Sequence, residues 1–155
     1  MLCVVAACAG PPTEVCGLPT EPPTGAEVRD GFGSATRTSG PPFEEEGSWA
    51  PAPSSSIVIG TLTFTIVREE TGLFVDDLIA DGAFPICVPL GEQGPQSGSA
   101  NVVDGGFVTD GEHEGGLALL GQDDGLLLGR FEMDLANPSG ETLTFSDGVF
   151  RVPQR

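Results

Sequence analysis

The feature that most constrains the fold is a two-residue alternation of apolar and polar side chains. Residues 61–66 read Thr-Leu-Thr-Phe-Thr-Ile, and residues 131–135 read Phe-Glu-Met-Asp-Leu. Because successive side chains of a β-strand point to opposite faces, each segment places its apolar residues on one face and its polar residues on the other. The alternation predicts strands with one buried face and one solvated face, and therefore an all-β fold.

Turn residues divide the second half of the chain into short apolar segments. Asn137-Pro-Ser-Gly140 has the order typical of a type I turn, and Ser146-Asp-Gly148 predicts a second tight turn, so we expect three successive antiparallel strands near the C-terminus. A spacing of roughly 8 to 12 residues between strands is typical of a sandwich or a barrel. We predict an antiparallel β-sandwich of about seven to nine strands. Its other expected strands lie near residues 73–75, 84–88, 100–103, 106–109, 117–120 and 126–128.

The first third of the chain has a different composition. Nine of the fourteen prolines fall within residues 9–56, among Thr, Ser, Glu and Gly. Such a segment buries too little apolar surface to offset the entropy of ordering it. We therefore predict a disordered, low-complexity linker over residues 9–56 and the β-sandwich domain over residues 57–155. Within the linker, residues 27–32 have enough apolar content for an edge strand, and Phe43 and Trp49 are candidates to anchor the linker on the domain.

The N-terminus is apolar and ends in small residues followed by Gly10-Pro-Pro. The sequence Val5-Ala6-Ala7-Cys8 resembles the lipobox of bacterial lipoproteins, in which an aliphatic residue and two small residues precede the cysteine that is lipidated. The resemblance implies that residues 1–8 are the end of an export signal, that Cys8 is the lipidation site, and that a start codon further upstream supplies the rest of the signal. The alternative is a cytosolic chain whose first residues are apolar.

The cysteines fit export. If Cys3 is removed with the signal and Cys8 carries lipid, Cys16 and Cys87 remain as a pair in an oxidising compartment. A disulfide between them would close a loop of about 70 residues and stabilise the fold by a few kcal/mol. The alternative is an unpaired Cys16 and a Cys87 that serves as a small core residue.

Charge restricts the partners. Twenty-three acidic residues against six basic ones give a formal net charge of -17, so nucleic acid would be repelled and is excluded as a partner. The simplest interpretation is that the negative charge keeps the protein soluble. We expect contact with a membrane through the lipid anchor alone, because no stretch approaches the roughly 18 apolar residues of a spanning helix, and we expect a protein or glycan as the remaining partner.

Few residues indicate chemistry. The one histidine, His113, lies in Asp110-Gly-Glu-His-Glu-Gly-Gly116 without a second histidine at metalloprotease spacing, and the interpretation as a solvated loop histidine is favoured. Acidic pairs in glycine-rich loops make Asp110, Glu112, Asp123 and Asp124 weak candidates for a Ca²⁺ site, although Asp-Gly is also ordinary turn chemistry. Any pair of carboxylates for hydrolysis could be close by chance, given 23 acids.

The last segment supports both the predicted fold and the predicted location in the cell envelope. Gly129-Arg-Phe-Glu-Met-Asp-Leu and Thr144-Phe-Ser-Asp-Gly-Val-Phe-Arg-Val152 resemble the C-terminal hairpins of secreted bacterial lipoproteins with a β-sandwich domain, a resemblance that supplies no catalytic residues. We expect a non-enzymatic, lipid-anchored protein of the outer membrane or cell surface with a structural or binding role and no cofactor. The alternatives are a secreted protein, a calcium-stabilised adhesion or carbohydrate-binding module, and a hydrolase.

Overall fold

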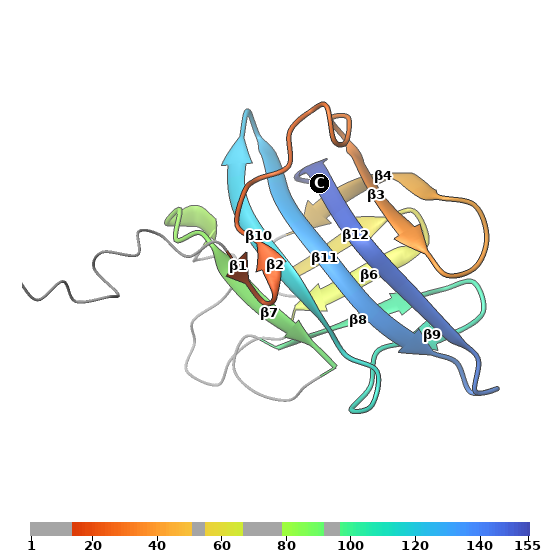
Figure 1. Ribbon diagram of the computed structural model, residues 1–155. Helices are drawn as coiled ribbons and strands as arrows, with labels where there is room; N and C mark the ends of the chain where they lie inside the picture. Colours follow the sequence, from red (N-terminus) through yellow and green to blue (C-terminus); the bar gives the residue numbers. More distant parts are fainter. Residues whose placement is uncertain (1–13, 51–54, 67–78, 92–96) are drawn as a thin grey trace, which may run out of the picture.

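The computed structural model describes residues 14–50, 55–66, 79–91 and 97–155 (Figure 1). The all-β class is confirmed by twelve strands in these ranges. The N-terminal half contains β1 (Glu14–Val15), β2 (Leu18–Pro19), β3 (Phe32–Arg37), β4 (Phe43–Ala50), β5 (Ser55–Ile59) and β6 (Leu62–Ile66). The C-terminal half contains β7 (Ile86–Leu90), β8 (Gly98–Val102), β9 (Phe107–Val108), β10 (Gly115–Asp123), β11 (Leu126–Ala136) and β12 (Thr142–Pro153).

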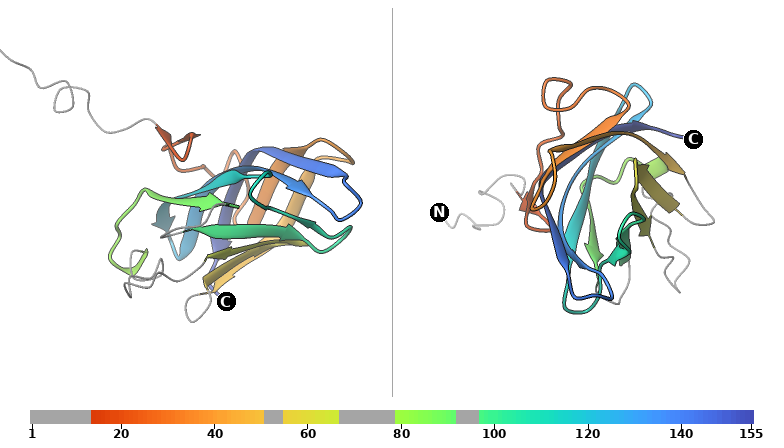
Figure 2. Two further views of the ribbon diagram at one scale, coloured as in Figure 1. Left: turned by 90° about the horizontal axis from the view of Figure 1, so that it is seen from below. Right: turned by 90° about the vertical axis from the view of Figure 1, so that its right-hand side faces the viewer.

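The predicted sandwich is wrong, because the sheet closes into a barrel. Nine strands follow one another in the order β10-β7-β8-β6-β5-β4-β3-β12-β11, and β11 pairs again with β10 (Figure 2). The short strand β9 bridges β8 and β11. Alternation specifies which face of a strand is buried, but it does not specify whether the two edges of a sheet meet. Bulges in the β10–β11 and β11–β12 ladders bend the long strands that close the ring.

The inside of the barrel is a packed core. Four phenylalanines, Phe64, Phe131, Phe145 and Phe150, are fully buried there. The rings of Phe64 and Phe131 meet edge to face with centroids 5.1 Å apart, and Phe43 meets Phe145 in the same way at 5.4 Å. Side chains therefore fill the interior, as they do in small barrels. The outer wall is where the surface features lie.

The predicted disordered linker is wrong over residues 14–50. Strands β1 and β2 form a two-stranded sheet, and β3 and β4 are strands of the barrel between β12 and β5. Phe43 and Trp49, expected to anchor a linker, are buried members of the core. The edge strand expected over residues 27–32 is also displaced, since β3 begins at Phe32 and is paired on both sides. The prediction failed because it rested on average composition, which does not show that a few apolar residues among the prolines and glutamates occupy buried positions.

The predicted C-terminal turns had different outcomes. The turn at Asn137–Gly140 is confirmed, and the Gly140 amide donates to the Asn137 carbonyl at 3.0 Å. The turn expected at residues 146–148 is wrong, because β12 continues through it with a register shift between Ser146 and Val149. Asp147 there has a φ of 53°. A bulge and a tight turn both accept a residue with positive φ, so Asp-Gly alone could not distinguish them.

Other expected strands are confirmed with shifted limits as β7, β8, β9, β10 and the start of β11. The hairpin partner of β6 is β5, joined through Gly60, whose φ is 57°. The strand expected at residues 73–75 lies outside the described residues. No helix among the described residues is long and apolar enough to cross a membrane.

Residues 14–31, hereafter the strap, cross the outer wall of the barrel in front of β10 and β11 (Figure 1). Among the strands that the structure describes, β1 and β2 pair only with each other, as a separate two-stranded sheet. Leu18 of β2 contacts Ala118 and Leu120, which are outward-facing residues of β10, in a small buried cluster. The strap is therefore a second layer that covers one side of the barrel.

Candidate functional site

A disulfide fixes the N-terminal end of the strap. Cys16 and Gly17 form the turn between β1 and β2, with φ values of 56° and 71°. Cys16 is bonded to Cys87 of β7, and their Cα atoms are 5.4 Å apart. The predicted pairing of Cys16 with Cys87 is confirmed, and the alternative of two unpaired thiols is wrong.

Arg151 fixes the opposite end of the strap. It projects from the outer face of β12, and its Nε donates to Asp30 at 2.8 Å while its Nη1 donates to the carbonyl of Pro23 at 3.0 Å. Its Nη2 reaches Asp123, at the end of β10, at 3.3 Å. The hydrogen bond to Asp30 raises the pKa of Arg151 although burial opposes the shift, and the bond to Asp123 adds to it. One guanidinium thus joins the strap to two strands of the wall.

Arg130 holds the middle of the strap from the neighbouring strand β11. Its Nε donates to the carbonyl of Glu21 at 2.9 Å. Its two terminal nitrogens contact the two carboxylate oxygens of Glu27, Nη1 at 3.1 Å and Nη2 at 3.4 Å. This paired geometry orients both planar groups and leaves the charge of Arg130 compensated.

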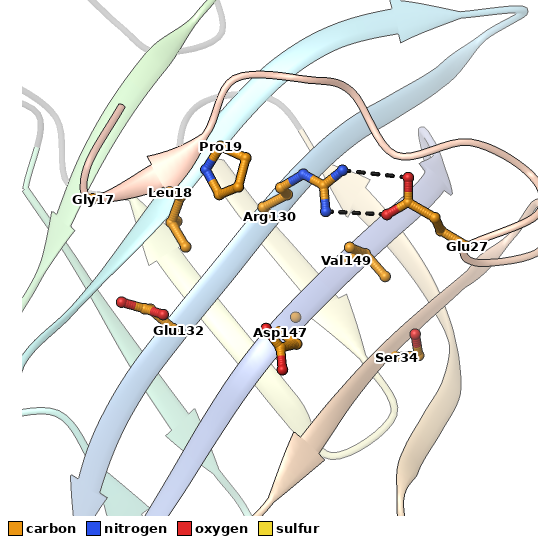
Figure 3. A pocket seen from close by; sticks show the side chains of 10 residues that line it. Gly17, Leu18, Pro19, Glu27, Ser34, Arg130, Glu132, Asp147 and Val149 are labelled. Atoms are coloured by element: carbon orange, nitrogen blue, oxygen red, sulfur yellow. Dashed lines mark hydrogen bonds and ion pairs between the residues drawn. The ribbon is translucent and has the colours of Figure 1, made fainter. Parts of the chain in front are cut away.

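A pocket of about 440 Å³ opens between the strap and the outer faces of β11, β12 and β3 (Figure 3). Glu27 and Arg130 form one side of it, and Leu18 and Pro19 form another. Glu132 and Asp147 are exposed at its lower part and make no hydrogen bond or ion pair with other described residues. The lining consists of Gly17, Leu18, Pro19, Glu27, Ser34, Arg130, Glu132, Asp147, Gly148 and Val149.

The chemistry of this pocket favours binding. Its lining combines carboxylates, one guanidinium, one hydroxyl and apolar carbon, but no imidazole or thiol. The Ser34 hydroxyl therefore has no adjacent base among the lining residues, which a nucleophilic serine requires. The uncompensated carboxylates and the apolar wall can hold polar or cationic groups by hydrogen bonding and contact.

The Ca²⁺ candidates on the first acidic loop serve the loop itself. The Asp110 Oδ1 atom accepts from the amides of Glu112 and His113, both at 2.8 Å, and lies 2.9 Å from the His113 Nδ1 atom. The amide of Glu112 and then the side chain of His113 lower the pKa of Asp110. Asp110 therefore closes a turn, with its side chain mimicking a backbone acceptor. His113 is a half-buried member of this turn.

The second pair of Ca²⁺ candidates also has other roles. Asp123 is paired with Arg151, while Asp124 and Gly125 form the turn from β10 to β11 with φ values of 51° and 81°. Across the described residues, no three His, Cys, Asp or Glu side chains gather as a metal-binding group. Cys8, the predicted lipidation site, lies outside the described residues.

The sequence analysis missed Arg130 and Arg151. Both occupy outward positions of strands predicted to be half exposed, where an arginine is ordinary. The strap carboxylates that pair with them lie 103 and 121 residues earlier, within the segment interpreted as a linker. The scarcity of basic residues was the available signal, since a cation in so acidic a chain is seldom unpaired.

Comparisons of the sequence with models of protein families and with curated proteins find no match. A comparison of the fold with solved structures also finds none.

Proposed function

We propose that this chain is a non-catalytic, lipid-anchored protein of the bacterial cell envelope that uses its barrel to bind a protein or glycan. The observation that carries the proposal is the bond between Cys16 and Cys87. Disulfides persist in oxidising compartments such as the periplasm and the cell surface, and they are rare in the cytosol. The bond therefore supports export, which the lipobox-like Val5-Ala6-Ala7-Cys8 also implies.

The strap defines the geometry of the anchor. Only seven residues lie between Cys8 and Cys16, and the eight residue-to-residue steps from one to the other span at most about 29 Å when fully extended. The barrel is thus held close to the bilayer instead of at the end of a long spacer. The two or three acyl chains of a mature lipoprotein would make this attachment stable.

A binding role is supported by the surface. The barrel interior is filled by aromatic and aliphatic side chains, so the outer wall and loops remain as contact surfaces. The pocket beside the strap offers carboxylates, a hydroxyl and apolar carbon to a ligand. Rigid barrels that present loops and pockets are common scaffolds for recognition.

The test is expression of the gene from an upstream start codon in a bacterial host, followed by membrane fractionation and intact-mass measurement. We expect the wild type in the membrane fraction with a lipid adduct on Cys8, and the Cys8→Ser variant without either. Cys3→Ser is the matched control and should remain lipidated, because Cys3 precedes the cleavage site. If Cys8→Ser leaves mass and fractionation unchanged, the anchor is contradicted.

The same samples also show whether the disulfide between Cys16 and Cys87 is present. Alkylation under denaturing conditions, with and without reductant, reports whether Cys16 and Cys87 are free thiols. A protein that is bonded but lacks lipid would support a secreted form. A protein with free thiols in the cytosolic fraction would contradict export altogether.

A further inference from the structure

The strap is attached to the barrel mainly through side chains and one covalent bond. Its strands β1 and β2 belong to a sheet of their own, and the barrel closes from β3 onward without them. Backbone hydrogen bonds to the wall occur at its last residue, where the Gly31 amide donates to the Arg151 carbonyl at 2.7 Å and the Gly31 carbonyl accepts from the Gly47 amide at 2.9 Å. Removing the strap from the wall would therefore leave the ladders of the nine-stranded ring paired.

The wall beneath the strap has an unusual composition for an outer surface. Ala118 and Leu120 of β10 point outward and are nevertheless buried, because Leu18 covers them. Arg130 and Arg151 project from the next two strands. The surface thus combines an apolar patch with two cations on a protein whose formal charge is -17, and the exposed carboxylates of Glu132 and Asp147 lie beside Arg130.

The strap complements this surface in both apolar contact and charge. Leu18 meets the apolar patch, and the carboxylates of Glu27 and Asp30 meet the two guanidinium groups. The carbonyls of Glu21 and Pro23 also accept hydrogen bonds from those arginines. The strap shows which ligand fits there, namely an extended acidic segment with one apolar anchor.

The covalent attachment joins two partly exposed residues. Cys16 sits at the tip of the β1–β2 turn, and both Cys16 and Cys87 are only partly buried. Thiol–disulfide exchange requires that the attacking thiolate reach one sulfur. After the bond opens, Leu18, the hydrogen bonds from Arg130 and Arg151 to the carbonyls of Glu21 and Pro23, and two ion pairs still join the strap to the wall. The carboxylates of those ion pairs are 38% and 65% exposed, and solvent screens exposed pairs.

We propose that the Cys16–Cys87 bond is a redox latch. A dithiol reductant opens it: the bond between the two cysteine sulfurs breaks, two electrons and two protons produce the thiols of Cys16 and Cys87, and the reductant becomes a disulfide. The strap then leaves the wall while the barrel stays closed. The uncovered face of β10, β11 and β12 becomes a docking surface for an acidic, extended peptide from a partner protein.

Hydrogen exchange of the full-length chain tests the latch, with Cys3→Ser and Cys8→Ser introduced so that only the pair remains. Reduction with dithiothreitol is expected to raise exchange of strap amides at least about tenfold and to leave β11 and β12 protected. Reoxidation should restore strap protection. Unchanged strap exchange would overturn the proposal, and so would an equal rise throughout the barrel, which would mean global unfolding.

A labelled peptide tests the docking surface. The probe is a synthetic copy of residues 14–31 carrying Cys16→Ser, titrated to millimolar concentration because the tethered strap competes at a similar effective concentration. Binding should occur to the reduced chain, weaken as salt rises, and fall at least about tenfold in Arg130→Met/Arg151→Met. Arg155→Met is the control for a lost positive charge. Equal binding to oxidised and reduced protein, or no loss in the double variant, would refute the docking surface.

Discussion

Asp30 and Arg151 are separated by 121 residues in sequence, and their side chains meet at 2.8 Å on the outer wall of the barrel. The arginine is nearly buried, whereas its two carboxylate partners are largely exposed. Its guanidinium therefore loses most of its water and depends on fixed acceptors, a situation in which removal of the whole side chain has a measurable cost.

Replacing Arg151 with methionine is expected to lower the free energy of unfolding by about 1–2 kcal/mol. The range is at the low end for charged hydrogen bonds because solvent screens the exposed partners. Urea unfolding followed by circular dichroism measures the change. Arg155→Met is the matched control, since the side chain of Arg155 is exposed and, among the described residues, bonds to Ser56 alone, and the substitution should cost less than about 0.5 kcal/mol. Equal effects of the two substitutions would contradict a structural role for Arg151.

A second prediction concerns Gly129, which is directly opposite Phe150 in the β11–β12 ladder. A Cβ atom at residue 129 would overlap the Phe150 ring and the Ala118 carbonyl. We expect Gly129→Ala to destabilise the protein by about 1–3 kcal/mol, because the ring and the backbone must shift. Gly121→Ala is the control, since a Cβ there meets no atom within 4 Å. Melting temperatures of the two variants measure the difference, and equal values would contradict the packing.

Phe43→Ala tests the placement of β4 in the barrel. The ring is buried and meets Phe145 edge to face. Its removal should lower stability by about 3–5 kcal/mol, whereas Glu46→Ala on the exposed side of the same strand should change it by less than about 0.5 kcal/mol. Urea midpoints report both. A small effect of Phe43→Ala would contradict the placement of β4 in the barrel and favour a linker over residues 32–50.

The loop of Asp110 should respond to acid. Three hydrogen bonds to its carboxylate lower the pKa of Asp110 below the ordinary value of 3.8. A depressed pKa in the folded state means that the contribution of this group is present above the ordinary value and is lost as pH falls through the lowered one. NMR shifts of the Glu112 and His113 amides should therefore titrate with a midpoint below 3.8.

Asp110→Asn is the control for this titration, because the amide keeps an acceptor oxygen and removes the ionisable group. The acid transition of the two amides should disappear in the variant. A midpoint at or above 3.8 in the wild type would show that the loop does not stabilise the carboxylate.

Local periodicity was sufficient for the strands but not for their closure. The alternation in β6 and β11 identifies their inward faces, because a period of two is a property of the chain itself. Closure depends on β10 pairing with both β7 and β11, which are set by contacts distant in sequence. In the same way, β4 belongs to the barrel because Phe43 and Trp49 are buried in the core, and β3 pairs with it. The average composition of the 48 residues predicted as a linker does not reveal these buried positions.

For the site, the sequence could identify Cys16 and Cys87 as a possible pair, since two cysteines remain once Cys3 is assigned to the signal and Cys8 to the lipid. It could not place Arg130 and Arg151 against the strap, because neither arginine has a local motif and both partners lie in a proline-rich segment. The acidic loops were visible as turn signals, and Asp110 and Asp124 do occupy turns.

The position of Cys87 also determines how mechanical tension would pass through the molecule. Because Cys16 is bonded to β7, a pull on the N-terminus is transmitted directly into that strand and bypasses the strap. Strand β7 is joined to β10 by five register pairs and to β8 by one. Force therefore enters the wall beside a ladder of one register pair, and the covalent bond that resists denaturation also directs load toward that ladder.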